Sequence, residues 1–124
     1  MKRLIALLIC TFIMFSCNKS GNSNNFQFAG NWQGIYSGND DHGTWKVDID
    51  QNGIAKGSST SLVFSETFSL SGTVTPQGSI ALTFGNATSG GSFNGTIQGN
   101  NASGKWENKM TNPAFSGTWS GNKN

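Results

Sequence analysis

The chain has 124 residues, of which 11% are charged and 35% hydrophobic, and its formal net charge is +2. This length allows one small domain. Gly, Ser, Asn and Thr together make up 59 of the residues, and this composition excludes a coiled coil or another long-helix protein. A disordered chain would be poor in aromatic residues, whereas this one has nine Phe and four Trp. The composition therefore favours a packed all-β domain.

The first 17 residues have the order of an export signal. Two basic residues, Lys2 and Arg3, precede a 12-residue apolar run (4–15), and Cys17 follows shortly after it. Because a membrane-spanning helix needs roughly 20 residues, we expect a removable signal peptide over 1–16 rather than a permanent span. Cys17 is then either a bystander in an ordinary signal or a site of lipid attachment. The second interpretation is favoured because no later cysteine could pair with Cys17 in a disulfide.

The segment Met14-Phe15-Ser16-Cys17 resembles the lipobox of bacterial lipoproteins, in the relaxed form found in Bacteroidota. In that family a small residue precedes a cysteine that is diacylated on sulfur and becomes the first residue after cleavage. The resemblance implies a lipid anchor at Cys17, and two acyl chains would hold the protein firmly at a membrane. Asn18 does not match the aspartate that keeps many lipoproteins at the inner membrane. The resemblance therefore implies the outer membrane of a Gram-negative cell envelope.

Residues 18–25 contain no apolar side chain, which is typical of a flexible tether. We therefore divide the chain into a lipoprotein signal peptide (1–16), a lipidated cysteine with its tether (17–25) and one β-barrel domain (26–124). Removal of the signal peptide also removes two basic residues, which leaves six basic and six acidic side chains. The expected mature chain has no net side-chain charge.

From residue 26 onward, apolar residues alternate with period two in short runs, and no stretch has a helical period. The clearest run places Trp45, Val47 and Ile49 on one face, and turn signals at 50–53 and 76–78 separate such runs. The predicted strands are 32–36, 45–50, 54–63, 68–74, 80–84, 93–97, 102–106 and 115–119. Eight successive antiparallel strands predict an up-and-down meander barrel.

Five of these strands contain a glycine between two residues of the same face, as in Phe93-x-Gly95-x-Ile97 and Phe115-x-Gly117-x-Trp119. A glycine inside a strand permits a sharp bend or makes room for a bulky neighbour across the sheet. A sheet that coils until its edges meet needs both, so the motif favours a closed barrel over a flat sandwich. The opposite face carries Ser, Thr and Asn, which indicates a water-facing outer wall rather than a transmembrane barrel.

Three short segments are similar to segments of avidin-like and lipocalin-like barrels: Gly30-Asn31-Trp32, Gly43-Thr44-Trp45 and Thr118-Trp119-Ser120-Gly121. In avidin-like proteins, strands with ligand-contacting residues follow the Thr-Trp-Ser-Gly segment, whereas three residues follow it here. Biotin binding is therefore not implied. Small Bacteroidota lipoproteins with Gly-Thr-Trp-rich barrels resemble the chain better, and that resemblance implies no activity.

The mature chain offers few groups for catalysis: one His, four Asp, two Glu and no Cys after Cys17. Asp40-Asp41-His42 has the residue types of a zinc or calcium site, but adjacent residues of one loop rarely converge on an ion. We expect a solvated loop without a metal, and no catalytic residue, cofactor or enzymatic activity, since no catalytic motif is present. The lack of a Lys/Arg stripe predicts no nucleic-acid partner.

Binding then remains, and three hypotheses stay open. In the first, the barrel mouth binds a small apolar or amphipathic ligand. In the second, the domain is a structural or protein-interaction module, including an inhibitor-like one, on the envelope surface. The third is sugar binding by an exposed Trp. The candidate ligand-lining rings are Trp32, Tyr36, Trp45, Trp106 and Trp119. An open mouth with exposed rings favours the first hypothesis, and a filled interior favours the second.

Overall fold

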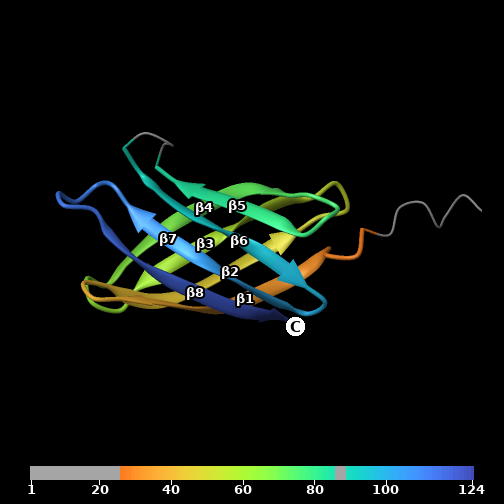
Figure 1. Cartoon of the computed structure of the whole chain (residues 1–124), viewed down its shortest axis with the longest axis horizontal. Coiled ribbons are helices and arrows are strands. Elements are labelled where there is room, and N and C mark those ends of the chain that lie inside the picture. The colour runs from red at the N-terminus through yellow and green to blue at the C-terminus, as the bar shows by residue number, and fades with distance from the viewer. Residues whose placement is uncertain (1–25, 86–88) are drawn as a thin grey trace, which may run out of the picture.

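The computed structural model describes residues 26–85 and 89–124. This part of the chain is all-β, with strands β1 (Gly30–Gly38), β2 (His42–Ile49), β3 (Ile54–Ser61), β4 (Glu66–Val74), β5 (Ser79–Phe84), β6 (Gly91–Gln98), β7 (Asn101–Asn108) and β8 (Phe115–Lys123). Each strand pairs antiparallel with the next, and β8 pairs with β1 to close the barrel (Figure 1). The predicted eight-stranded meander barrel is confirmed, whereas the predicted signal peptide, Cys17 and tether lie outside the described residues.

The period-two pattern correctly predicts which side chains face inward. In β2, for example, Trp45, Val47 and Ile49 are buried, and the residues between them are exposed. The prediction is wrong at the end of β3, which stops at Ser61 instead of continuing to residue 63. The Ser61 hydroxyl accepts a hydrogen bond from the backbone N–H of Phe64 (2.9 Å), and the chain turns there.

The connections between strands gather at two ends of the barrel (Figure 1). At the entry end, the chain comes in at Phe26, and the turns β2–β3, β4–β5 and β6–β7 lie beside the end of β8. Phe26 and Phe28 are in edge-to-face contact there, with centroids 5.6 Å apart, and Trp32 Nε1 donates to the Phe28 carbonyl (2.9 Å). The opposite end, which we call the mouth, carries the connections β1–β2, β3–β4, β5–β6 and β7–β8.

Tryptophan rings inside the barrel lie over glycines of neighbouring strands. Trp119 in β8 is opposite Gly104 in β7, and Gly104 is in turn opposite Gly95 in β6. A Cβ atom added at Gly95 would come within 2.7 Å of the Trp119 ring. The Trp119 indole N–H donates to the carbonyls of Asn94 (3.3 Å) and Lys105 (3.1 Å). The glycines thus make room for the ring, as the sequence motif predicts.

Two further tryptophans repeat this arrangement. Trp45 is opposite Gly34, and its indole N–H donates to the carbonyls of Ile35 and Ser120, each at 3.2 Å. Trp106 is opposite Gly117, and its indole N–H donates to the Ser37 carbonyl (3.0 Å). Because their N–H groups are all hydrogen-bonded inside the barrel, these rings fill the core without leaving buried polar atoms unsatisfied.

The outer wall is polar along most strands. Ser69, Ser71 and Thr73 in β4 and Asn94 and Thr96 in β6 are exposed, as the alternation predicts. Within residues 26–85 and 89–124, no helix is long and apolar enough to cross a membrane.

Candidate functional site

The five rings predicted to line a ligand site all belong to the packed core. Trp32, Tyr36, Trp45, Trp106 and Trp119 are each at most 5% exposed. Their packing is mutual, since Trp45 meets Trp119 edge-to-face at 5.4 Å and Tyr36 meets Trp106 at 5.1 Å. All four tryptophans of the chain are buried, so the exposed Trp that the sugar-binding hypothesis requires does not exist. Tyr36 and Trp106 do border a small cavity inside the barrel.

Asp41 departs from the predicted solvated loop. Asp40 and His42 are exposed as expected, but Asp41 is only 6% exposed. Its Oδ2 accepts a hydrogen bond from the Tyr36 hydroxyl (3.1 Å), and its Oδ1 accepts bonds from the Ser61 hydroxyl (2.6 Å) and the His42 backbone N–H (2.8 Å). These donors from β1, β2 and β3 hold the carboxylate inside the barrel end, where a buried polar group needs partners. Within the described part of the chain, no three His, Cys, Asp or Glu side chains are grouped to hold a metal ion.

Asp41 borders two cavities at the mouth. The inner cavity has a volume of about 10 Å³, which is enough for one water-sized group. Above it lies a mouth pocket of about 320 Å³. The two share Asp41, Phe68 and Asn108 as wall residues. The mouth pocket is lined by Asp41, Phe64, Glu66, Phe68, Asn108, Met110, Thr111 and Phe115.

The rim of the mouth is apolar and exposed, a feature that the sequence analysis missed. Leu62, Val63, Phe64 and Met110 are each between 46% and 60% exposed. Phe64 is stacked on Phe115, with centroids 6.2 Å apart and an interplanar angle of 11°. A signal was present in the sequence, because three consecutive apolar residues at 62–64 cannot all face the interior of a strand with period two.

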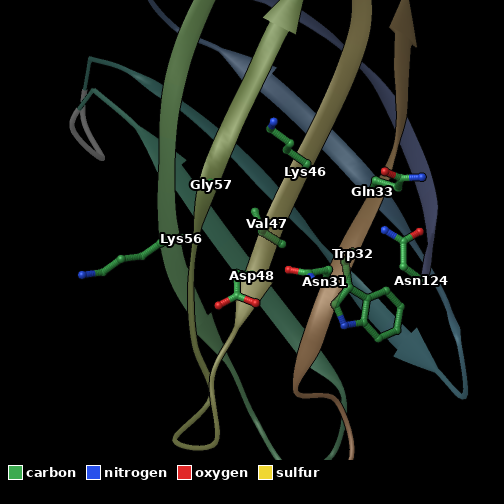
Figure 2. Close-up of a pocket in the computed structure, with 9 residues that line it drawn as sticks. All are labelled: Asn31, Trp32, Gln33, Lys46, Val47, Asp48, Lys56, Gly57 and Asn124. Atoms are coloured by element: carbon green, nitrogen blue, oxygen red, sulfur yellow. The ribbon is translucent and has the colours of Figure 1, made fainter.

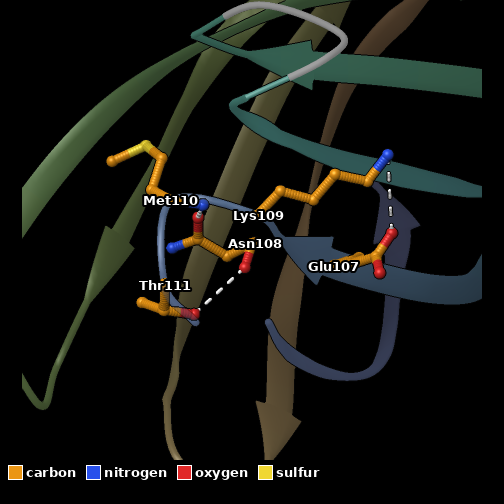
Figure 3. Close-up of polar contacts among 5 residues, drawn as sticks. All are labelled: Glu107, Asn108, Lys109, Met110 and Thr111. Carbon is orange, nitrogen blue, oxygen red and sulfur yellow. Dashed lines mark hydrogen bonds and ion pairs between the residues drawn. The ribbon is translucent and has the colours of Figure 1, made fainter. Parts of the chain in front are cut away.

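Asn108 holds the β7–β8 loop in the conformation that presents Met110 (Figure 3). Its Oδ1 accepts the backbone N–H of Met110 (2.9 Å), and its carbonyl accepts the Thr111 hydroxyl (3.2 Å). Thr111 Oγ1 in turn accepts the backbone N–H of Phe115 (3.0 Å), at the start of β8. The wall formed by this loop is therefore braced by side-chain hydrogen bonds.

The mouth is acidic. Asp40, Asp41, Glu66 and Glu107 lie at or next to its loops, against one lysine, Lys109. Lys109 Nζ lies 4.0 Å from Glu107 Oε1 in a half-exposed ion pair (Figure 3), a kind of contact that contributes little stability. Neither cavity has a lysine or arginine among its lining residues.

A groove of about 280 Å³ on the outer wall of β1, β2 and β3 is an alternative site (Figure 2). Its charged side chains are Lys46, Asp48 and Lys56, and they point in different directions rather than toward a common centre (Figure 2). The mouth, by contrast, combines a buried carboxylate with apolar walls. We therefore take the mouth as the candidate binding site.

Burial raises the pKa of the Tyr36 hydroxyl, and the charge and hydrogen bond of Asp41 raise it further. A group whose pKa is higher in the folded state contributes stability below its unfolded pKa, about 10 for tyrosine, and this contribution is lost as the pH rises above that value. Tyr36 is the one tyrosine of the chain. In an ultraviolet absorbance titration, we expect the folded protein to form no phenolate near pH 10, whereas the urea-unfolded protein ionises at about pH 10. If Tyr36 in the folded protein ionises at the same pH as in the unfolded protein, the buried Tyr36–Asp41 contact is contradicted. Tyr36→Phe, which has no tyrosine, provides the absorbance blank.

No protein-family model and no curated protein matches the chain. The function is therefore inferred from the geometry of the mouth and from the sequence.

Proposed function

We propose that this protein is a lipid-anchored, non-catalytic binding module of the bacterial cell envelope, and that it binds a small amphipathic ligand at the mouth of its barrel. The mouth pocket is the observation that supports this function. Its volume of about 320 Å³ falls within the range of small-molecule sites, which combine mostly apolar walls with a few polar groups. Here Phe64, Phe68 and Phe115 supply apolar surface, and Asp41 and Glu66 supply polar groups.

The filled core changes which aromatic residues would line the site of this hypothesis, from the five buried rings to Phe64, Phe68 and Phe115 at the mouth. A ligand inside the barrel would have to displace rings that are hydrogen-bonded and packed against each other. At the mouth, the pocket already exists and its floor is the rigid core. Binding there requires little rearrangement, which favours affinity because few side chains must be ordered on association.

The position of the mouth suits an anchor at Cys17. The barrel domain begins at Phe26, at the entry end, and the mouth lies at the opposite end (Figure 1). An anchor at Cys17 would therefore join the barrel at the end away from the mouth, which leaves the mouth free to face solvent. We expect Cys17→Ser to move the protein from the membrane fraction to the soluble envelope fraction, because stable attachment requires the acyl chains. Unchanged membrane association on cell fractionation would rule out this anchor.

The ligand hypothesis is tested with hexan-1-ol, a neutral amphipathic probe, titrated calorimetrically into the full chain carrying Cys17→Ser. We expect binding that Phe64→Ala weakens about tenfold, because the ring supplies apolar surface to the pocket. Ile35→Ala is the matched control, since Ile35 is similarly exposed (58%, against 51% for Phe64) but lies on the outer wall of β1. Equal effects of the two substitutions would argue against a ligand site at the mouth.

A second candidate function is a protein-interaction module, and the filled barrel interior favours it. The exposed rim residues Leu62, Val63 and Met110 would then contact a protein partner instead of enclosing a small ligand. This function predicts no binding of small amphipathic probes.

A further inference from the structure

We propose that the ligand carries a primary ammonium group, which binds the Asp41 carboxylate while its apolar part occupies the mouth pocket. This inference rests on the proposed function, because it specifies the ligand of the same site. Three observations support it: the partners of Asp41, the size of the inner cavity and the charge of the mouth.

Among the described residues, Asp41 has hydrogen-bond donors but no cationic partner. Its three donors are the hydroxyls of Tyr36 and Ser61 and the backbone N–H of His42, all of them uncharged. An ionised carboxylate offers about four acceptor positions. Oδ1 accepts two of the three hydrogen bonds and Oδ2 accepts one, so one acceptor position remains on Oδ2. Across residues 26–85 and 89–124, the ion pair that forms is Lys109–Glu107, and it does not involve Asp41. Buried charges are normally paired, so an incoming cation would complete this site.

The inner cavity sets the size of the cationic group. Its volume of about 10 Å³ holds one water-sized group. A primary ammonium is about as large as a water molecule and donates three hydrogen bonds, whereas a trimethylammonium group is several times larger. Tyr36, Phe84, Phe93 and Trp106 line the cavity, and aromatic rings attract cations. The cavity therefore favours an ammonium and rejects its methylated form.

The rest of the mouth favours a cation over an anion. Glu66 places a second carboxylate on the wall of the mouth pocket, and an excess of acidic side chains at one end attracts cations and repels anions. The apolar walls formed by Phe64, Phe68 and Phe115 suit an alkyl or aryl chain rather than a small hydrophilic amine. The ligand class is thus an amphipathic primary amine.

The experiment compares four six-carbon probes by calorimetry on the Cys17→Ser full chain at pH 7: hexylamine, hexan-1-ol, hexanoate and hexyltrimethylammonium. We expect hexylamine to bind at least about tenfold more tightly than hexan-1-ol, because its hydrogen bond to Asp41 is charge-assisted. Hexyltrimethylammonium and hexanoate should both bind at least about tenfold more weakly than hexylamine.

Asp41→Asn keeps the shape of the side chain and removes its charge. We expect the preference for hexylamine over hexan-1-ol to fall from at least about tenfold in the parent chain to about twofold or less in this variant, because the charge-assisted hydrogen bond is lost. Asp48→Asn, which removes an exposed carboxylate from the outer wall of β2, is the matched control and should change neither affinity. If Asp41→Asn does not fold, Glu66→Gln at the exposed start of β4 replaces it and should lower the ratio of the hexylamine affinity to the hexan-1-ol affinity.

The outcomes separate the two proposals. Equal affinities for hexylamine and hexan-1-ol would overturn the ammonium inference and leave the proposed function standing. If hexylamine binds tightly but hexyltrimethylammonium binds with the same affinity, the inner cavity is excluded as the site of the cationic group. An amine preference that survives both Asp41→Asn and Glu66→Gln would exclude the carboxylates. If none of the four probes binds, the proposed function itself fails.

Discussion

Gly117→Ala is expected to lower the free energy of unfolding by about 3 kcal/mol, since overpacking of a core and loss of a buried hydrogen bond act together. A Cβ atom at residue 117 would lie 2.7 Å from Trp106 Nε1 and would also press on the Ser37 carbonyl oxygen. These two atoms form the hydrogen bond that satisfies the Trp106 indole (3.0 Å). Gly117 is also opposite Gly38, in the β1–β8 pairing that closes the barrel. The substitution therefore disturbs both the packing of the core and the β1–β8 pairing that closes the barrel.

The measurement is a urea unfolding curve followed by tryptophan fluorescence, with a thermal melt beside it. For a domain of this size, about 3 kcal/mol corresponds to a fall in Tm of roughly 12 to 24 °C. Ser116→Ala is the matched control, because Ser116 is the exposed neighbour of Gly117 on β8, and surface substitutions usually change stability by less than about 0.5 kcal/mol. If the two variants unfold at the same urea concentration, the glycine is not required for ring packing.

The fold could be predicted because its signals are local. Period-two alternation assigns Trp45, Val47 and Ile49 to the interior from neighbouring residues alone, and turn residues such as Gly53 and Gly78, both at positive φ, separate the strands. Closure followed from the repeated glycine motif. The same alternation could not distinguish a packed core from the wall of a cavity, because both require inward aromatic rings. The cross-strand register decides between them by placing glycines opposite the indoles.

The site was harder to predict because it depends on contacts between loops. Asp41 and Ser61 are 20 residues apart in the chain, and nothing in the sequence near Asp41 shows that a hydroxyl from β3 will reach it. In the sequence alone, Asp41 is therefore indistinguishable from its solvated neighbours Asp40 and His42. Phe64 and Phe115 are likewise brought together only by the mouth. Local sequence patterns identify the inward and outward faces of a strand. Which loop residues meet at one end of the barrel is decided by the order and direction of the strands, which no local pattern contains.

Trp119→Ala and Phe64→Ala together test whether stability and binding reside in different aromatic residues. Trp119 is 3% exposed, and its ring contacts Trp45 at 5.4 Å and Phe93 at 6.3 Å between centroids. Removal of such a buried indole costs about 4 kcal/mol. Phe64 is 51% exposed, so its removal should cost about 1 kcal/mol or less while weakening probe binding at the mouth.

Urea unfolding and hexan-1-ol titration of both variants give the two readouts. We expect opposite patterns. Trp119→Ala loses stability, and the fraction that remains folded still binds the probe at the mouth. Phe64→Ala keeps its stability and binds the probe weakly. The reason is that the core ring supports the strands from inside, while the mouth ring lies on the pocket wall. A Trp119→Ala variant that kept its stability but lost the probe would place the ligand among the interior rings, and the mouth pocket would then be its entrance.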